Sequence, residues 1–522
     1  MIKWYKLMAI GCLFWLVSCF SYPTSVFADT KPDESEMKLL LVYDSLDTSG
    51  SGEEKISTLQ RLLTSFNVVV TTISVAEYHE NEMSDFNGII TLINAPDLAI
   101  ENPFYLKDCD AFTGLKLHIG GNLPMKWQKQ LGIELEQING ERGNLVSLSE
   151  KANEVMETEL TVEVAAGISE AAEEFGRIDF ENHNELKPYG ILNGNSAYLP
   201  YLKPVGLSFI LTSQLIQKWL KQTGTFNPML VFTDVTPFSN LPLIKYLADQ
   251  LYDAGIPFAL SATSVWQNVD LKAMKNYTDM LRYVAARNGG LLLKTPEVMG
   301  VSREQRDLAA IMPKTIDELV ADNVFPVGIS APAYWNQDTE YQQDGLSYSS
   351  TVLLLPNPKK LQYRDKTTTA PIYDTTYFGL PVSSLRAIEW GAIERHKFNT
   401  PTALTYKIPD TRKEWDSINK ELNQLPFLFR GINLREHNVV TEINQIKVEN
   451  AILTVNGERE YPETMVKSVA GKQAKTVKDT GSLTDFFNLQ DKIFIVIISA
   501  TLFVLSIFFV IGYNLYKGKY RK

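Results

Sequence analysis

The first part of the chain alternates short apolar runs with amphipathic stretches. The run KLLLVYDSL is apolar on both faces, as in a buried parallel strand. The segment EEKISTLQRLLTSF places Ile56, Leu59, Leu62 and Leu63 at helical spacing. The runs NVVVTTIS, NGIITLINA and LKLHIGGN predict three further strands. This alternation predicts a doubly wound α/β domain over residues 37–135.

The pattern then changes twice. Residues 136–205 are less regular, and strand-like runs such as TELTVEVAAG predict a β-rich connector. The segment SFILTSQLIQKWLKQTG predicts an amphipathic helix ending at Gly224. We place this helix at the start of a central domain over residues 206–400.

The central domain repeats strand and helix patterns. PMLVFTDVTPFSN predicts a strand that ends at Asp234, and NLPLIKYLADQLYDAG predicts a helix that ends at Gly255. The strand IPFALSAT, the helix LKAMKNYTDMLRYVAARNGG and the strand LLLKT follow, and NVFPVGISAPAYW and SSTVLLLPNP supply later strands. Such β-α units predict a parallel barrel or sheet whose site lies at the carboxyl ends of the strands.

The region after the central domain is smaller. Residues 401–466 contain TALTYKIPD, a helix pattern and the strands of NQIKVENAILTVNG, which predict an α+β, β-rich extension. Asn456-Gly457 suits a hairpin turn. Residues 467–492 are polar and rich in lysine, as in a linker.

Both ends of the chain resemble targeting segments. Residues 493–513 are 21 residues without a charge, enough for a transmembrane helix. The tail, 514–522, is basic, which predicts a cytoplasmic carboxyl terminus and an extracellular bulk. Residues 1–28 read as a signal peptide cleaved after Ala28. In the alternative, the lipobox-like LVSC makes Cys19 a lipidated terminus.

Composition narrows the class of protein. A chain of 522 residues exceeds one hydrophobic core, so we expect two to three domains. The net charge of -11, without a dense basic run, argues against nucleic-acid binding. Cleavage after Ala28 leaves Cys109 as the one cysteine. An exported protein without internal disulfides fits the cell membrane of a Gram-positive bacterium.

The predicted amino-terminal domain carries no recognisable chemistry. It resembles flavodoxin-like or glutamine-amidotransferase-like sheets. Amidotransferase chemistry needs a nucleophilic cysteine at a strand-to-helix elbow, and the sequence has none there. The glycines of SGSG, residues 49–52, are too few for a phosphate-binding loop. We therefore expect a scaffold or recognition domain.

The central domain also resembles a known family. The resemblance rests on four segments in order: VFTDVTPF, GIPFALSAT, the Gly-Gly strand and GISAPAYW. Over residues 228–335 the chain resembles a divergent bacterial family of the polysaccharide deacetylase superfamily. The resemblance implies a distorted (β/α)7 barrel. It also implies hydrolysis of acetamido groups on extracellular sugars, with one divalent metal.

The residues that this chemistry requires are mostly replaced. The family holds its metal with an aspartate and two histidines, beside a carboxylate base. The resemblance matches Asp234 to the metal-binding aspartate but puts Thr233 at the position of the base. Lys294 and Val298 occupy the positions of the family's two metal-binding histidines. Ala333 occupies the position of a later histidine of the family. These positions are therefore vestigial, and no catalytic residue is assigned.

The remaining donors make a poor metal site. Glu297 could add an oxygen to Asp234, but an all-oxygen pair is under-coordinated. The positive charge of Lys294 also opposes a cation. Asp234 has an alternative role as a turn or helix cap, which needs no metal. In another alternative, Lys294 forms an ordinary ion pair with Asp234 or with Glu297. The sequence implies no cofactor, and a divalent metal only if the protein is an active deacetylase.

Sugar binding requires only a cleft, aromatic faces and hydrogen-bond donors, so it can persist where the catalytic residues are lost. Aromatic rings among amides suit carbohydrate stacking, although such rings also pack in loops. We expect the candidate ligand-binding residues to be Asp234, Trp266, Lys294, Tyr334 and Trp335.

Three functions fit the sequence. The first is a membrane-anchored, inactive deacetylase-like protein that binds or guides an exopolysaccharide at the cell surface, as in biofilm assembly. The second is an active metal-dependent carbohydrate deacetylase with an unconventional site. The third is a structural partner of a membrane glycosyltransferase complex that makes the polysaccharide.

Overall fold

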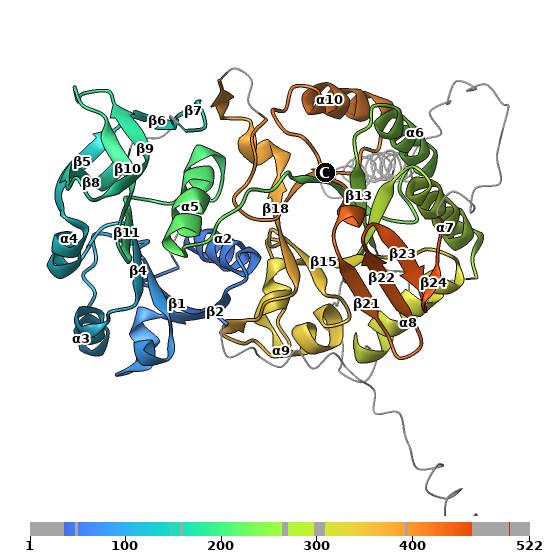
Figure 1. Cartoon of the computed structure of the whole chain (residues 1–522), viewed down its shortest axis with the longest axis horizontal. Helices are drawn as coiled ribbons and strands as arrows, with labels where there is room; N and C mark the ends of the chain where they lie inside the picture. The colour runs from blue at the N-terminus through green and yellow to red at the C-terminus, as the bar shows by residue number, and fades with distance from the viewer. Residues whose placement is uncertain are drawn as a thin grey trace, which may run out of the picture. The chain divides into compact units, whose positions relative to one another are not determined.

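The computed structural model describes most of the chain between residues 36 and 461. The described residues are 36–46, 51–147, 149–156, 160–263, 270–296, 308–391, 395–461 and 501. All strands and helices named below lie in one unit, Lys38–Lys522 (Figure 1).

The predicted targeting segments fall outside this part. The signal peptide, 1–28, the linker, 467–492, and the tail, 514–522, are not among the described residues, and of the predicted transmembrane segment only Thr501 is. None of the helices within the described ranges has the length and apolarity needed to cross a bilayer.

The amino-terminal half is organised around one sheet of eleven strands. Its order is β17-β2-β1-β3-β4-β11-β10-β9-β6-β7-β19. Four parallel strands follow the predicted apolar runs: β1 (Lys38–Tyr43), β2 (Val69–Ser74), β3 (Gly88–Leu92) and β4 (Leu115–Ile119). The order 2-1-3-4 is that of doubly wound sheets. The structure thus shows the expected α/β arrangement.

Helices and short turns connect these strands. They are α2 (Ser51–Ser65), η1 (Val75–Glu77), η2 (Glu82–Asp85), α3 (Pro103–Ala111) and α4 (Met125–Leu131). The four apolar residues of α2 that define its helical period are buried, from Ile56 to Leu63. The helix therefore forms because its apolar stripe packs into the core.

Residues 136–205 are not a separate connector. Five of their strands extend the same sheet: β6 (Gly143–Ser147), β7 (Ala152–Val155), β9 (Glu173–Phe180), β10 (Lys187–Asn193) and β11 (Ser196–Leu199). Strand β11 pairs in parallel with β4 and covers an otherwise open edge. Strands β5 (Ile133–Glu141) and β8 (Leu160–Ile168) form an antiparallel ribbon.

The helix before the central domain also belongs with the sheet. Helix α5, Gly206–Trp219, contacts β6, β7, β9, β10 and β11. From its sequence the helix was expected to belong to the barrel domain. Most of its residues are buried, since it fills the space over these strands. The helix is where the sequence predicted it, but its packing partner is different.

The central domain is a closed barrel of parallel strands. Its seven strands are β12 (Met229–Val235), β13 (Phe258–Thr263), β14 (Gly289–Lys294), β15 (Gly328–Pro332), β16 (Thr351–Leu355), β18 (Thr375–Pro381) and β20 (Thr402–Lys407). The predicted parallel barrel is confirmed. The closing strand β20 pairs with both β12 and β18, although the sequence analysis placed it in the extension.

The connections around the barrel are uneven. Helices follow the first three strands: α6 (Leu241–Asp253), α7 (Lys272–Ala285) and α8 (Leu308–Ala321). The later connections contain only short helical turns: η4 (Ala333–Gln337), α9 (Thr339–Tyr341), η5 (Gln342–Leu346) and η6 (Val382–Leu385). The barrel is therefore distorted in its second half.

The carboxyl-terminal extension closes the amino end of the barrel. It comprises α10 (Arg412–Leu422), η7 (Ile432–Leu434), β21 (His437–Val440), β22 (Gln445–Glu449), β23 (Ile452–Val455) and β24 (Glu458–Arg459). Ile432 and Val448 join the core inside the barrel. Gly290 is required here, because a Cβ would lie 2.2 Å from Ile432 Cγ2. Asn456-Gly457 makes the predicted hairpin turn, with both φ values positive.

Two short strands from the barrel region complete the large sheet. Strand β17, Thr369–Ala370, pairs with β2 at one edge, and β19, Glu389–Trp390, pairs with β7 at the other. The buried guanidinium of Arg61 in α2 also donates to the carbonyl of Gly379 in β18, at 2.7 Å. Sheet and barrel are therefore joined by backbone pairing and by a buried hydrogen bond.

Candidate functional site

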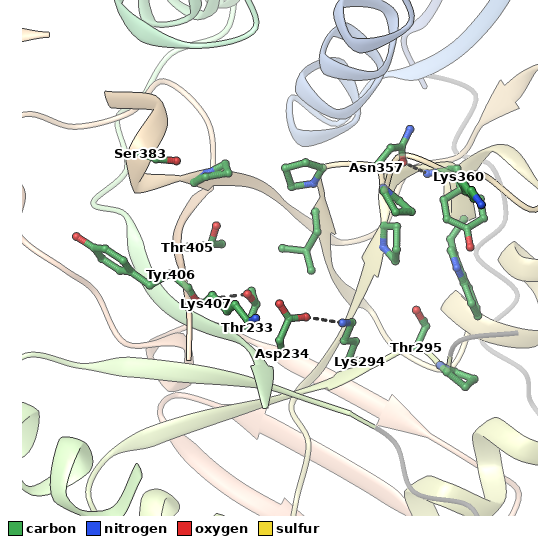
Figure 2. A pocket seen from close by; sticks show the side chains of 18 of the residues that line it. Thr233, Asp234, Lys294, Thr295, Asn357, Lys360, Ser383, Thr405, Tyr406 and Lys407 are labelled. Atoms are coloured by element: carbon green, nitrogen blue, oxygen red, sulfur yellow. Dashed lines mark hydrogen bonds and ion pairs between the residues drawn. The ribbon is translucent and has the colours of Figure 1, made fainter. Parts of the chain in front are cut away.

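A cavity of about 750 Å³ lies at the carboxyl end of the barrel (Figure 2). Its lining includes residues at or next to the ends of six strands: β12, β14, β15, β16, β18 and β20. This is the end at which parallel barrels place their sites. The cavity is therefore the candidate functional site.

Asp234 enters the cavity from a bulge in β12. The register between β12 and β13 shifts between Phe232 and Val235. Asp234 itself has a φ of 60°, in the left-handed region. Bulges at barrel rims redirect a side chain, and aspartate tolerates this conformation better than most residues. The bulge explains why Asp234 faces the mouth.

Asp234 is paired with Lys294 across the mouth. The Nζ of Lys294, the last residue of β14, donates to Oδ1 of Asp234 at 2.7 Å. The lysine side chain is 17% exposed and the aspartate side chain 46% exposed. The structure thus brings together two of the predicted site residues as an ion pair, one of the two alternatives left open for Asp234.

The residues present do not fit the metal that the deacetylase resemblance implies. The carboxylate of Asp234 already holds an ammonium group, and Ala333 supplies only a methyl group. The hydroxyl of Thr233 donates to the carbonyl of Tyr406 at 3.4 Å. Within the described ranges, no three His, Cys, Asp or Glu side chains gather in a way that could hold a metal. No chemical step is therefore derived through a metal.

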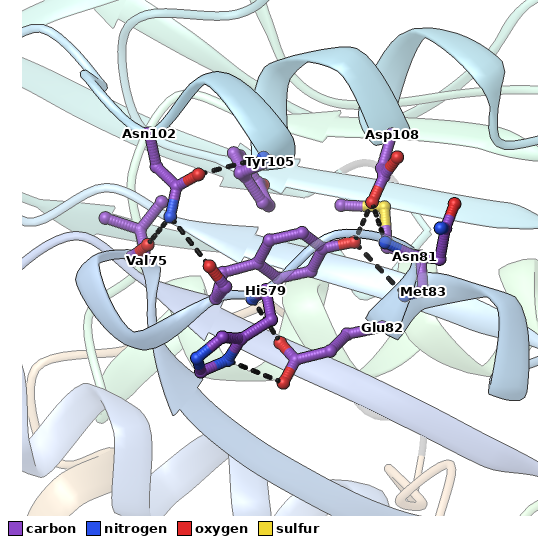
Figure 3. Close-up of polar contacts among 9 residues, drawn as sticks. Val75, His79, Asn81, Glu82, Met83, Asn102, Tyr105 and Asp108 are labelled. Carbon is purple, nitrogen blue, oxygen red and sulfur yellow. Dashed lines mark hydrogen bonds and ion pairs between the residues drawn. The ribbon is translucent and has the colours of Figure 1, made fainter.

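All five imidazoles are described, and each has a partner away from Asp234. The pairs are His79 with Glu82, His118 with Gly121 O, His183 with Glu141, His396 with Glu150, and His437 with Thr351 and Ile432 O. Figure 3 shows the first of these pairs. None of these rings lies in the mouth of the barrel.

Asp108 organises the turn that contains His79 (Figure 3). Its Oδ2 accepts hydrogen bonds from the hydroxyl of Tyr78, at 2.7 Å, and from the backbone N–H of Asn81, at 2.6 Å. The neighbouring Cys109 is buried, and burial raises the pKa of its thiol to about 12. This cluster holds a loop in place, and the thiol beside it is buried and neutral.

Trp335, one of the candidate ligand-binding residues, is almost completely buried. Only 1% of its surface is accessible, and its ring stacks on Tyr341 with centroids 4.3 Å apart. A Cβ at Gly345 would lie 2.5 Å from this ring, so the backbone presses against it. Trp335 is among the residues that line the cavity, but its ring packs against Tyr341 and is almost fully buried. The expectation that this ring stacks on a ligand is therefore corrected: its main contact is within the loop.

Tyr334 keeps a partly exposed position in the cavity lining. Its ring meets those of Tyr341 and Tyr363 edge to face. The candidates Trp266, Glu297 and Val298 lie outside the described residues.

The structure adds cationic residues that the sequence analysis missed. Lys407, Lys360 and Arg386 all line the cavity. Lys407 ends β20 and is the direct strand partner of Thr233. The rule that found Asp234 and Lys294, a polar residue at the end of an apolar strand, also applies to TALTYK. It would have found Lys407 had that strand been assigned to the barrel.

Arg386 is fixed by an acid outside the lining. Its guanidinium donates to both oxygens of Glu421, at 2.6 and 3.0 Å. This pair raises the pKa of Arg386 and lowers that of Glu421. Burial and the charge of Glu421 together raise the pKa of the Tyr406 hydroxyl. Both partners of the pair are therefore charged at neutral pH, and the tyrosine is neutral.

Comparison with known proteins gives no assignment. No protein-family model and no curated protein matches the chain. The solved structure of a glutamine amidotransferase from Thermotoga maritima is similar at 12% identity and a TM-score of 0.21. That match covers 48% of this chain and 98% of the other. At such a TM-score the similarity supports no conclusion about this chain's fold or chemistry.

Proposed function

We propose that this chain is a membrane-anchored, non-catalytic surface protein whose barrel mouth binds an exopolysaccharide. The proposal depends on one observation. At the end of the barrel where a deacetylase would hold its metal, the acid Asp234 is paired with Lys294, next to an open cavity. The pair blocks metal binding but leaves the cavity free for a ligand.

The cavity suits part of a sugar chain. Its volume, about 750 Å³, falls within the usual range of ligand sites. Hydroxyl, amide and ammonium groups line it together with the ring of Tyr334. Sugars need such directional partners, and an aromatic face adds apolar contact. The deacetylase-like strand motifs favour a glycan over other polar ligands. The predicted signal peptide and transmembrane helix support a location of the site outside the cell.

The test uses the full-length chain and immobilised poly-N-acetylglucosamine. We expect binding, and we expect it to weaken in Tyr334→Ala, which removes a partly exposed ring. Tyr252→Ala is the matched control, because this exposed ring lies on α6 away from the cavity lining. If no glycan polymer binds, the proposal fails, and a protein-contacting role in a glycosyltransferase complex is favoured.

One observation favours the active deacetylase as a second candidate. Asp234 holds a left-handed backbone conformation, and backbone strain of this kind gathers at functional sites. The discriminating measurement is acetate release from acetylated chitooligosaccharides with added Zn²⁺ or Mn²⁺. We expect no release above the blank. Release that is lost in Asp234→Asn but kept in Asp249→Asn would establish the enzyme.

A further inference from the structure

The cavity at the barrel mouth is cationic, in a chain that is acidic overall. Its lining contains four basic side chains, Lys294, Lys360, Arg386 and Lys407, and one carboxylate, Asp234. The whole chain has a formal net charge of -11. The sign of the charge is thus reversed locally. A cleft lined by one sign of charge concentrates ligands of the opposite sign.

Two of the four basic groups are already neutralised. Lys294 is paired with Asp234, and Arg386 is paired with Glu421. Both pairs are well aligned and short. Asp234, Lys294 and Arg386 line the cavity, but these two ion pairs contribute little net charge to it.

Lys360 and Lys407 carry the remaining positive charge. Lys407 ends β20 next to Thr233, and Lys360 lies in the segment after β16, so the two approach from different walls (Figure 2). Both side chains are exposed, and neither ammonium group forms an ion pair or a hydrogen bond within the described part of the chain. A ligand can therefore supply the missing negative charge.

The acids on the neighbouring helix α2 do not fill this role. Glu53 and Glu54 are the acidic residues in the first turn of α2. Neither glutamate belongs to the cavity lining. The positive charge of Lys360 and Lys407 is therefore not offset from within the cavity.

A buried hydroxyl in the same cavity also lacks a partner. Thr295 follows Lys294 directly, is 2% exposed and lines the cavity. Its Oγ1 is fully buried and makes no hydrogen bond within the described residues. A ligand oxygen that reached this hydroxyl would supply the missing hydrogen-bond partner.

We infer that the glycan bound at this mouth is acidic, with a carboxylate or phosphate group on its sugars. The anionic group lies between Lys407 and Lys360, and a sugar oxygen pairs with Thr295. This inference rests on the proposed function and narrows it to one class of glycan. Carboxylate and phosphate share the chemistry that the two lysines recognise.

The test measures binding of the full-length chain to three immobilised polymers. They are polygalacturonate, poly(glycerol phosphate) and uncharged poly-N-acetylglucosamine. We expect at least one of the two anionic polymers to bind about tenfold or more tightly than the neutral one at low ionic strength. Binding should weaken toward ~0.15 M salt because exposed charges are screened. The preferred polyanion identifies the anionic group.

Variants assign the effect to the two lysines. Lys407→Gln and Lys360→Gln should each weaken polyanion binding by about three- to tenfold, because each removes one charge that acts directly on the ligand. Lys413→Gln and Lys359→Gln are the matched controls: both lysines are exposed and lie outside the lining, and they should bind as the natural chain does. All four positions are exposed, so folding should be unchanged.

The outcomes separate this inference from the proposed function. If the neutral polymer binds as tightly as both polyanions, and the cavity variants match their controls, the glycan is not acidic. The proposed function then stands and this inference falls. If none of the three polymers binds, both fail.

Discussion

Oδ1 of Asp234 lies 2.7 Å from Nζ of Lys294, and the aspartate has a φ of 60°. The two facts belong together, because the bulge between Phe232 and Val235 turns the carboxylate toward the mouth of the barrel. The ion pair thus depends on the bulge in β12, which orients Asp234, and on the position of Lys294 at the end of β14.

We expect Asp234→Gly to be more stable than Asp234→Ala by about 1 kcal/mol, because alanine is strained at positive φ and glycine is not. Both substitutions remove the ion pair, so their difference isolates the backbone term. Urea unfolding of the two variants gives the comparison. Equal free energies of unfolding would show that the backbone at this position is relaxed.

Arg61 should stabilise the protein more by packing than by its hydrogen bond or its charge. Its guanidinium lies 4.3 Å from the ring centroid of Phe378 and donates to Gly379 O. We expect Arg61→Ala to lower the free energy of unfolding by about 3 kcal/mol, and Arg61→Met, which keeps most of the volume, by clearly less. Chemical denaturation measures both. If the two variants lose equal stability, packing is not the main contribution.

Acid should destabilise the fold through His118. Burial lowers the pKa of this imidazole from 6.5 to about 4. As the pH falls below 6.5, the unfolded chain binds a proton that the folded chain does not. The free energy of unfolding therefore decreases, by about 2 kcal/mol between about pH 7.5 and about pH 5. Above about pH 7.5 the contribution is constant, because the imidazole is neutral in both the folded and the unfolded chain.

The contribution of His118 is isolated by substitution. The decrease with pH should be smaller by this amount in His118→Gln. His183→Gln serves as the control, because this ring is partly exposed and paired with Glu141. Urea titrations at the two pH values give the slopes. Identical pH dependence in His118→Gln and the natural protein would contradict the prediction.

The thiol of Cys109 should be inert in the folded protein. It is buried, and its raised pKa, about 12, leaves almost no thiolate at neutral pH. We expect no alkylation of Cys109 by iodoacetamide under native conditions and full alkylation in denaturant, as located by peptide mass spectrometry. Rapid native labelling at this residue would mean that the cluster around Asp108 opens readily.

Much of the local structure could be read from the sequence. The strands that start at Lys38 and Met229 and the helix over Ser51–Ser65 follow their apolar periods, and the Asn456-Gly457 turn follows its composition. Asp234 and Lys294 were found because polar residues at strand ends gather at one end of a parallel barrel. The burial of Trp335 could not be predicted from the sequence, because it depends on how the loop that contains Tyr341 folds against the tryptophan ring.

The sequence by itself determined where strands and helices form, because apolar periodicity is a local property of the chain. Only the tertiary structure decided which strands pair. It placed β20 beside β12, and so Lys407 beside Thr233, and it added β17 and β19 to a sheet formed by distant segments. Pairing depends on which edges other segments leave open. The charge of the cavity is therefore a property of the closed barrel and not of any one motif.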